Sequence, residues 1–447
     1  MGERKPASDR RSGRCQHYYY HCRPANTITP LAFVLLVTGA LFLILGPTNS
    51  SLTLPALRVQ FSNPIHIAAA ESPQPPPEAG NNTATTVDDG DEDAGLPPAR
   101  QLTDPPYSLG RTILGYDARR SAWLAAHPEF PARVPPAGRP RVLLVTGSAP
   151  SRCPDQDGDH LLLRAFKNKA DYCRVHGLDV FYNTAFLDPE MSGFWAKLPL
   201  LRSMMLAHPE AEFLWWVDSD AVFTDILFEL PWDRYAGHNL VLHGWEAKVY
   251  EEKHWVGINT GSFLIRNCQW SLDLLDALAP MGPRGPVRDM YGELFAKELT
   301  GRPPFEADDQ SALVYLLVTQ RERWGDKVFF ENSYDLNGFW EGIVDRYEEM
   351  RSKGRGEGKW PLVTHFVGCK PCRRYVDSYP AEKCRLGMER AFNFADDQIL
   401  KLYGFAHESL NGTAVQRVGN DTGGPLDADD GELARLLHPT FRAAVPT

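Results

Sequence analysis

Short runs of apolar residues alternate with longer stretches of helical spacing through the middle of the chain. The runs at 141–148, 178–183 and 213–217 predict strands, and the stretches at 161–176 and 194–207 predict the helices between them. Strand and helix therefore alternate repeatedly over this part of the chain. Such alternation is typical of an α/β fold with a doubly wound, mainly parallel sheet.

The pattern is less regular in the second half of the chain. Glycine and proline punctuate residues 282–304 and predict a loop there. Outside this loop, further strands are predicted at 239–245, 258–265 and 362–366, and further helices at 271–279, from 308 onward and through 392–400. These segments would widen the sheet and add to the helices that cover it.

An uncharged apolar stretch covers residues 28–46, close to the amino terminus. As a helix of nineteen residues it would be about 28 Å long, which is enough to cross a membrane once. The preceding residues 1–27 carry six Lys and Arg against one Glu and one Asp, so the positive-inside rule predicts a cytoplasmic tail. A cleaved signal peptide would have a shorter polar start, and an uncleaved transmembrane signal anchor is therefore favoured.

The composition changes again after the apolar stretch. Residues 47–105 are rich in Pro, Asn, Thr, Asp and Glu, and such a segment cannot bury enough apolar surface to fold. We expect it to form a disordered lumenal stem that holds a catalytic domain, residues 106–405, away from the membrane. Residues 406–447 would then form a carboxy-terminal tail.

The overall charge limits the partners of the chain. Its 47 Lys and Arg residues and 57 Asp and Glu residues give a formal net charge of −10, which argues against nucleic acid as a partner. Four Asn-X-Ser/Thr sequons fit a glycoprotein of the secretory pathway. They lie at Asn49, Asn81, Asn411 and Asn420.

Six cysteines follow the predicted membrane span, and in an oxidising lumen some of them are expected to form disulfides. They are Cys153, Cys173, Cys268, Cys369, Cys372 and Cys384. Six cysteines allow fifteen pairings, and the sequence does not choose among them. Cys369 and Cys372 form a C-X-X-C motif, but no second such motif or histidine pair accompanies it, which argues against a zinc or redox site.

Two carboxylates stand where the most apolar of the predicted strands ends. The run 213–217 consists of bulky residues only and is followed by Asp218, Ser219 and Asp220. Ligand sites in open α/β sheets lie at the carboxyl ends of strands. Two carboxylates at this spacing can converge on one divalent cation, which can also hold a phosphate. The motif therefore predicts a metal and diphosphate site.

Other polar residues also lie at predicted strand or helix ends. His365 ends a strand and precedes Gly368 and Lys370, so that an imidazole, a close backbone approach and a positive charge would occur together. Gly147 ends another strand, where backbone amides can meet a nucleotide. Asp308, Asp309 and Gln310 begin a predicted helix, where acidic side chains can simply cap free amides.

Each of these features has a structural explanation when it is taken alone: an acidic turn, a hydrogen-bonded histidine, a solvated lysine. Taken together, Asp218, Asp220, His365 and Lys370 predict two carboxylates and an imidazole around a divalent cation, with a lysine at the phosphates. Such a site would offset the charge that develops on a departing nucleoside diphosphate.

Five segments resemble plant glycosyltransferase family 34, and within it the xyloglucan 6-xylosyltransferases. The resemblance runs from about residue 107 to the carboxy terminus. The segments are Trp215-Trp-Val-Asp-Ser-Asp-Ala221, Asn259 to Asp276, Phe305-Glu-Ala-Asp-Asp-Gln-Ser311, His365-Phe-Val-Gly-Cys-Lys-Pro-Cys372 and Phe392-Asn-Phe-Ala-Asp-Asp-Gln398.

The resemblance implies a retaining transferase of the GT-A type fold in the Golgi membrane, with a single membrane span, type II orientation and a lumenal catalytic domain. It would move α-xylose from UDP-xylose to O6 of glucose units in a β-1,4-glucan, using Mn²⁺, in xyloglucan biosynthesis. A homodimer, or a heterodimer with related transferases, would be the active form. In the absence of a carboxylate assigned beneath the anomeric carbon, same-face attack is the favoured route for retention.

The resemblance also implies roles for individual residues. The metal would be held by Asp218, Asp220 and His365. The donor would contact Gly147, Asp218, Ser219, Asp220, Gly368 and Lys370. Catalysis would involve Asp308, Asp309 and Gln310, and the acceptor or sugar would contact Asn259, Asp289 and Gln310.

Three other functions fit parts of the sequence. Galactomannan α-1,6-galactosyltransferases, which use UDP-galactose, are related but are expected to carry Asn-Ala-Gly where this chain has Asn259-Thr-Gly261. A haloacid-dehalogenase-type phosphatase would carry its Asp-X-Asp motif at the start of the domain, whereas here strand and helix units precede Asp218. A weakly active scaffold subunit of a polysaccharide-synthesising complex would not need the full set of polar residues that this chain retains.

Overall fold

The computed structural model describes residues 98–419, apart from positions 132, 135–137, 149–152, 154–155, 186, 356–358, 371 and 373–378. The predicted membrane anchor, almost all of the predicted stem and three sequons, at Asn49, Asn81 and Asn420, lie outside the described residues. Within the described part of the chain, no helix combines the length and the apolar character that a membrane crossing requires.

A six-stranded sheet forms the centre of the molecule, in the order β4-β3-β5-β8-β7-β9. Five strands run in one direction, and β8 runs antiparallel to both of its neighbours. The predicted α/β class is therefore confirmed, and the sheet is mixed. The strands are β3 Val142–Gly147, β4 Asp179–Asn183, β5 Phe213–Val217, β7 Leu240–Gly244, β8 Ile258–Arg266 and β9 Val328–Glu331.

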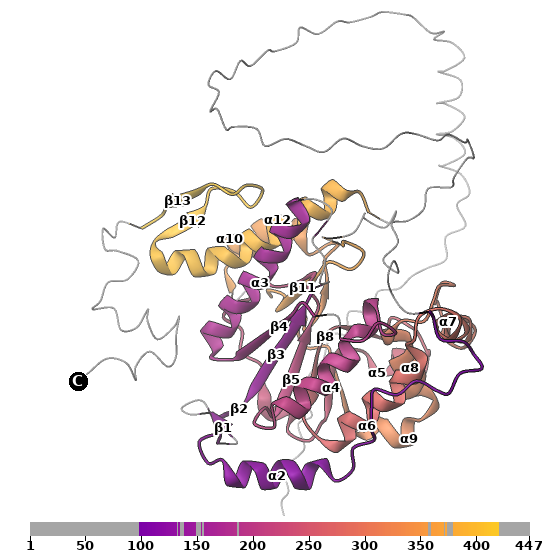
Figure 1. Cartoon of the computed structure of the whole chain (residues 1–447). Coiled ribbons are helices and arrows are strands. Elements are labelled where there is room, and N and C mark those ends of the chain that lie inside the picture. Colours follow the sequence, from indigo (N-terminus) through magenta and orange to yellow (C-terminus); the bar gives the residue numbers. More distant parts are fainter. Residues whose placement is uncertain are drawn as a thin grey trace, which may run out of the picture. The chain divides into compact units, whose positions relative to one another are not determined.

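Helices cover both faces of this sheet because successive side chains of each strand point to opposite faces. On β5, Leu214 and Trp216 pack with helices α4, α6 and α8, whereas Phe213, Trp215 and Val217 pack with α3 and α12. Figure 1 shows these two helical layers on either side of the strands. The helices are α2 Tyr116–Ala126, α3 Gln156–His176, α4 Lys197–Ala207, α5 Glu246–Tyr250, α6 Gln269–Leu278, α7 Pro286–Glu298, α8 Asp309–Thr319, α9 Arg321–Trp324, α10 Tyr347–Lys353 and α12 Ala381–Leu400.

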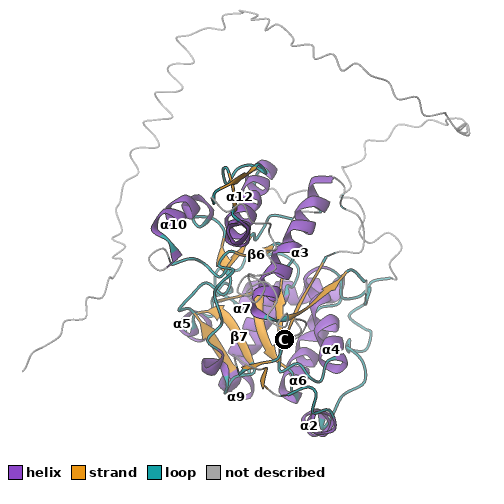
Figure 2. Ribbon diagram, turned by 90° about the vertical axis from the view of Figure 1, so that its left-hand side faces the viewer, coloured by secondary structure: helices purple, strands orange, loops and turns teal. Residues whose placement is uncertain are grey.

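A small second sheet joins two distant parts of the chain. It consists of β10 Gly338–Phe339, β11 Val363–His365 and β6 Ala221–Phe223. The antiparallel register of β6 and β11 pairs Ala221 with His365, so the chain that follows the acidic motif lies beside the predicted metal ligand. In Figure 2, β6 lies next to α3 and α12. This sheet therefore brings together the two predicted halves of the site.

The prediction of a loop over residues 282–304 is wrong. Residues 286–298 form α7, which begins at Pro286. Proline at the first position of a helix is favourable, because its fixed φ suits the helix and its missing N–H would have had no intrahelical partner. The glycines and prolines flank a helix here. The pattern also gave no sign of the short edge strand β9 or of α10.

The ends of the described region are tied to the domain. Arg100 forms a two-point ion pair with Glu190, with N–O distances of 2.6 and 2.9 Å, and the Tyr107 hydroxyl donates to Asp188 at 2.5 Å. At the other end, β12 Phe405–His407 and β13 Val415–Arg417 form a hairpin against α12. Contacts with the domain thus extend to residues that precede position 106 and follow position 405.

Two disulfides join the segment after β11 to other parts of the domain. Cys369 is bonded to Cys384 at the start of α12, and Cys372 is bonded to Cys153 in the connection between β3 and α3. The other two cysteines that follow the predicted membrane span, Cys173 and Cys268, are free. The two cysteines of the C-X-X-C motif are thus bonded to different partners, and the motif forms neither a redox dithiol nor a zinc site.

Candidate active site

The acidic motif forms a tight turn at the carboxyl end of β5. The Asp218 N–H donates to the Gly261 carbonyl of β8 at 2.7 Å, and the Ala221 N–H donates to the Asp218 carbonyl at 3.1 Å. The Asp218 carboxylate accepts a hydrogen bond from Trp216 Nε1 at 2.6 Å, and the Asp220 carbonyl accepts from the Phe366 N–H at 2.9 Å. Both aspartates are therefore held by the strands around them.

Asp218, Asp220 and His365 offer three ligand atoms within 4.8 Å of one another. His365 Nε2 lies 3.5 Å from an Asp218 oxygen and 3.3 Å from an Asp220 oxygen. The imidazole packs directly over Gly261, where an added Cβ would come within 2.1 Å of His365 Cε1. Two carboxylates and one imidazole make a donor set that fits a divalent cation such as Mn²⁺. These residues are therefore suited to hold a metal.

Lys370 adds a positive charge at the edge of this cluster. Its ammonium lies 3.1 Å from Asp220 and 5.6 Å from the centre of the Phe194 ring. Burial disfavours the charged form of Asp220, but Lys370 and His365 outweigh it and hold the pKa of this carboxyl well below its usual value. Asp220 is thus a carboxylate at neutral pH, as a metal ligand must be.

A second buried lysine, which sequence reasoning missed, stands on the other side of the acidic motif. Lys197 begins α4, and its ammonium lies 2.8 Å from Asp309 and 3.6 Å from Asp218. Burial lowers the pKa of Lys197, but the two carboxylates more than compensate and raise it. The ammonium also donates to the Thr260 carbonyl at 3.2 Å. Lys197 therefore joins the acidic motif to the start of α8.

The structure separates the three residues of the Asp-Asp-Gln run. Asp308 caps α8 by accepting from the Ser311 N–H at 2.8 Å, and its other oxygen lies 3.1 Å from Arg302. Asp309 is buried against Lys197, and burial raises its pKa. Gln310 donates from its side chain to the Trp255 carbonyl at 3.0 Å. Asp309 is part of the site through its ion pair with Lys197, whereas the contacts of Asp308 are those expected of a helix cap.

Asp308→Ala is expected to lower the free energy of unfolding by about 1–3 kcal/mol, because a helix cap is lost and Arg302 keeps a buried charge without its partner. Asp308→Asn, which can still cap, should lose less. Urea denaturation followed by circular dichroism measures both. A variant that unfolds like the wild type but has lost catalytic activity would show that Asp308 acts in catalysis.

The other predicted site residues lie on β3, on β8, in the acidic turn itself and just before Lys370. Gly147 ends β3, and the register of β3 with β5, extended by two residues, places it beside Asp218. Ser219 is half-buried in the turn, and Gly368 adopts a positive φ of 86° that suits glycine. Asn259 accepts from the Gly261 N–H at 2.7 Å and so supports the floor of the site.

Asp289 is not drawn into this cluster. It lies exposed in the first turn of α7, and its carboxylate forms no ion pair with any residue that the structure describes. An acidic side chain in this position interacts favourably with the helix amino terminus. The structure thus gives this residue a local role on α7.

Two residues of α3 support the segment after the acidic motif, and sequence reasoning missed them as well. Asn168 exchanges hydrogen bonds with Phe223, accepting from its N–H at 2.7 Å and donating to its carbonyl at 2.8 Å. Lys169 is fully buried and donates to the Ala221 carbonyl at 2.7 Å. Burial lowers the pKa of Lys169 to about 8, although Asp220 and Asp218 oppose this shift. In a sequence, a Lys next to an Asn in a helix is typical of solvated surface. No local signal therefore indicated that these two residues are buried and support the segment after the acidic motif.

The chain is similar in sequence to several plant proteins named as glycosyltransferases. A probable glycosyltransferase 5 of Oryza sativa subsp. indica is 78% identical over 444 residues, which cover 99% of this chain and 98% of that protein. A probable xyloglucan 6-xylosyltransferase 1 of the same rice is 60% identical over 351 residues, 78% of each chain. Xyloglucan 6-xylosyltransferase 1 of Arabidopsis thaliana is 58% identical over 361 residues, 80% of this chain and 77% of that one.

Likeness to solved structures is much weaker. A glycosyltransferase involved in the glycosylation of the major capsid of PBCV-1 matches with a TM-score of 0.36 and 14% identity, over 56% of this chain and 99% of that chain, which is too little to carry an argument. The sequence model of the galactosyl transferase GMA12/MNN10 family, glycosyltransferase family 34, matches residues 138–376. This span holds the whole cluster around Asp218 and Asp220, and the chain is a member of that glycosyltransferase family.

Proposed function

We propose that this chain is a xyloglucan 6-xylosyltransferase, which moves α-xylose from UDP-xylose to O6 of glucose units of a β-1,4-glucan with retention of configuration. The observation that carries the proposal is the convergence of Asp218, Asp220 and His365 beside Lys370 at the carboxyl end of β5. The names of the relatives at 58% and 60% identity support xylose and xyloglucan as substrates.

The residues of the cluster suit the two ends of a nucleotide-sugar diphosphate. Asp218, Asp220 and His365 would hold Mn²⁺, which when bound would offset the negative charge of the departing UDP. The Lys370 ammonium, which lies 3.1 Å from Asp220, would bind the diphosphate directly, and Gly368 would allow a close backbone approach. Ser219 and Gly147 would lie beside the nucleotide.

Retention is best explained by same-face attack, in which a donor phosphate oxygen accepts the proton of the acceptor hydroxyl. The alternative needs a carboxylate that is free to attack the anomeric carbon. Asp309 is neutralised by Lys197 at 2.8 Å, and Asp308 is engaged by Arg302 and the Ser311 N–H. These contacts argue against either aspartate as the nucleophile, and Asp309 and Gln310 would instead hold the sugar and the acceptor. A glycosyl adduct trapped on either aspartate would contradict this mechanism.

The proposed setting is the Golgi membrane, with residues 28–46 as a type II signal anchor, 47–105 as the stem and the catalytic domain in the lumen. The two disulfides are compatible with an oxidising lumen. Asn411 lies exposed on the hairpin after α12, where a glycan could be attached. We further propose a homodimer or a heterodimer with related transferases as the active form.

Full-length chain incubated with a cello-oligosaccharide, Mn²⁺ and either UDP-xylose or UDP-galactose should transfer xylose alone. Mass spectrometry and linkage analysis of the product would report a pentose on O6. Transfer of galactose alone would favour a galactosyltransferase, a possibility that the description of the matching family keeps open. Tight binding of the glucan without any transfer would indicate a scaffold subunit.

A further inference from the structure

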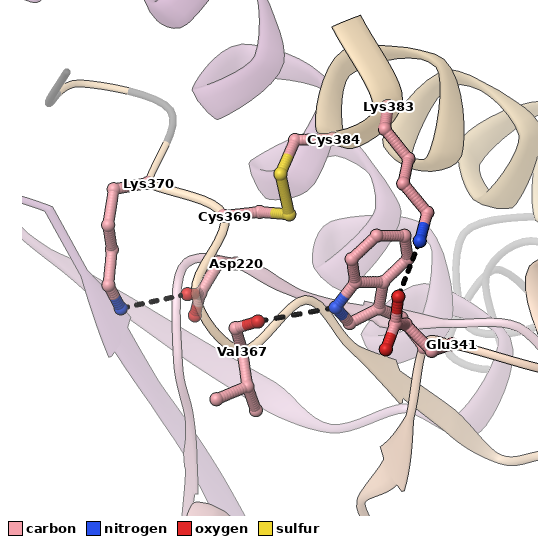
Figure 3. Close-up of a disulfide and its surroundings, with 8 residues drawn as sticks. Asp220, Glu341, Val367, Cys369, Lys370, Lys383 and Cys384 are labelled. Carbon is pink, nitrogen blue, oxygen red and sulfur yellow. Dashed lines mark hydrogen bonds and ion pairs between the residues drawn. A yellow bond between two sulfur atoms is a disulfide. The ribbon is translucent and has the colours of Figure 1, made fainter. Parts of the chain in front are cut away.

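The segment that carries Lys370 is anchored at two residues that precede the lysine, Val367 and Cys369. Cys369 is bonded to Cys384 of α12, and the Val367 carbonyl accepts a hydrogen bond from Trp340 Nε1 at 3.2 Å. Figure 3 shows the Cys369–Cys384 disulfide on one side of this segment and the Lys370 ammonium reaching Asp220 on the other. Residues 366–370 form what we call the lysine loop.

The anchors of the lysine loop are buried, whereas its functional end is accessible. Cys369 and Cys384 have no exposed surface, and the Phe366 ring stacks on Trp340 with centroids 5.5 Å apart. The Lys370 side chain is 31% exposed. A rigid base therefore supports a flexible side chain that points into the site from the loop.

The rigidity of this base matters for function because a lysine side chain does not by itself hold its ammonium in one position. Its charge sits on four rotatable methylenes and is strongly hydrated, so its position depends on where its backbone is held. Gly368, with its positive φ of 86°, turns the chain immediately before Cys369. A bond from Cys369 to α12 fixes the loop at the residue adjacent to Lys370. Without that bond, the lysine loop would be held by the Trp340–Val367 hydrogen bond before Gly368 and by the Cys153–Cys372 disulfide after Lys370, and the glycine between these two points could reorient.

We propose that the Cys369–Cys384 disulfide and the Trp340–Val367 hydrogen bond position Lys370 for the diphosphate of the donor. Cys369, Cys384 and Trp340 are then positioning residues that act through Lys370, and their contribution is to donor binding. This inference rests on the proposed function, since it takes a nucleoside diphosphate as the ligand of Lys370.

The test is a cycle of variants in the full-length chain, with UDP binding in the presence of Mn²⁺ measured by calorimetry. The variants are Cys369→Ser/Cys384→Ser, Lys370→Ala, and the three changes combined. We expect the disulfide variant to bind UDP about tenfold more weakly, because a charge-assisted hydrogen bond is lost or loosened. The combined variant should bind no more weakly than Lys370→Ala alone, because the disulfide acts only through that lysine.

Two further variants show whether a loss of UDP binding comes from the lysine loop or from a general failure to fold. Cys268→Ser changes a free cysteine at the start of α6, outside the site, and should bind UDP as the wild type does. Trp340→Phe keeps an aromatic ring but removes the hydrogen bond to Val367, so it loosens the lysine loop without altering a disulfide. Hydrogen exchange over residues 366–370 should become faster in both the disulfide variant and Trp340→Phe, with no ligand or metal present.

The outcomes separate this inference from the function on which it rests. Wild-type affinity for UDP in both the disulfide variant and Trp340→Phe would overturn the positioning role and leave the proposed function standing. Losses that add to that of Lys370→Ala would also overturn it, because the disulfide would then act elsewhere. Failure of the wild-type chain to bind UDP would overturn the proposed function, and this inference with it.

Discussion

Asp220→Asn should reduce sugar transfer by at least about a thousandfold, since the change removes one charge from the site without changing its shape. The Asp220 side chain lies 3.3 Å from His365 and 3.1 Å from Lys370, and only 4% of the residue is exposed. An amide in its place binds a divalent cation much more weakly than a carboxylate. Initial rates with labelled UDP-xylose, together with Mn²⁺ binding followed by electron paramagnetic resonance, would measure both losses.

Asp225→Asn provides the matched control for this variant. Asp225 is also a buried aspartate that follows β6 in the same segment, but its partner is Arg355 at 2.8 Å, outside the acidic cluster. Its replacement should lower stability and leave the affinity for Mn²⁺ unchanged. If Asp220→Asn kept its Mn²⁺ affinity and lost less than tenfold in rate, the metal site proposed here would be wrong.

Lys197→Met is expected to weaken both folding and transfer. The ammonium is buried between Asp309 and Asp218, so its removal leaves a buried carboxylate without a counter-charge. Breaking a buried pair in this way costs about 3–5 kcal/mol of stability. Transfer should fall at least about a hundredfold, because Asp218 and Asp309 lose the group that joins them. Urea denaturation and initial rates, measured on the same preparation, would report the two effects separately.

The double variant Lys197→Met/Asp309→Leu distinguishes these effects. Replacing both partners of a buried ion pair by apolar groups of similar size is often close to neutral for stability. We expect the double variant to regain most of the lost stability and none of the lost transfer. Recovery of transfer along with stability would mean that Lys197 serves the fold alone.

The parts of the site that lie within one stretch of sequence could be predicted. The strand at 213–217 and the carboxylates that follow it lie where the pattern placed them, since five bulky residues can only be buried and Asp218 must then emerge at an edge. Lys370 and His365 were recognised in the same way from the end of the strand that the structure shows as β11. In each case one short segment contains both the scaffold and the functional group.

The parts of the site that depend on contacts across the fold were not predictable from the pattern. Lys197 is the first residue of a mostly apolar helix, and nothing near it in sequence shows that α8 will bring Asp309 against it. The pairing of the six cysteines also depends on which loops meet in space, so fifteen connectivities remained open in the sequence. Pro286 was misread for a different reason, because proline both ends and begins helices.

The amino-terminal end of the described region sets a limit on how far the chain can be shortened from that side. Arg100 and Tyr107 hold the segment around Asp188 and Glu190, and the chain continues from that segment to Lys197 at the acidic cluster. A chain shortened to begin before Arg100 would keep both contacts. A chain that begins between Arg100 and Tyr107 would lose the ion pair and keep the Tyr107 hydrogen bond, so the starting residue determines how many of these supports the domain retains.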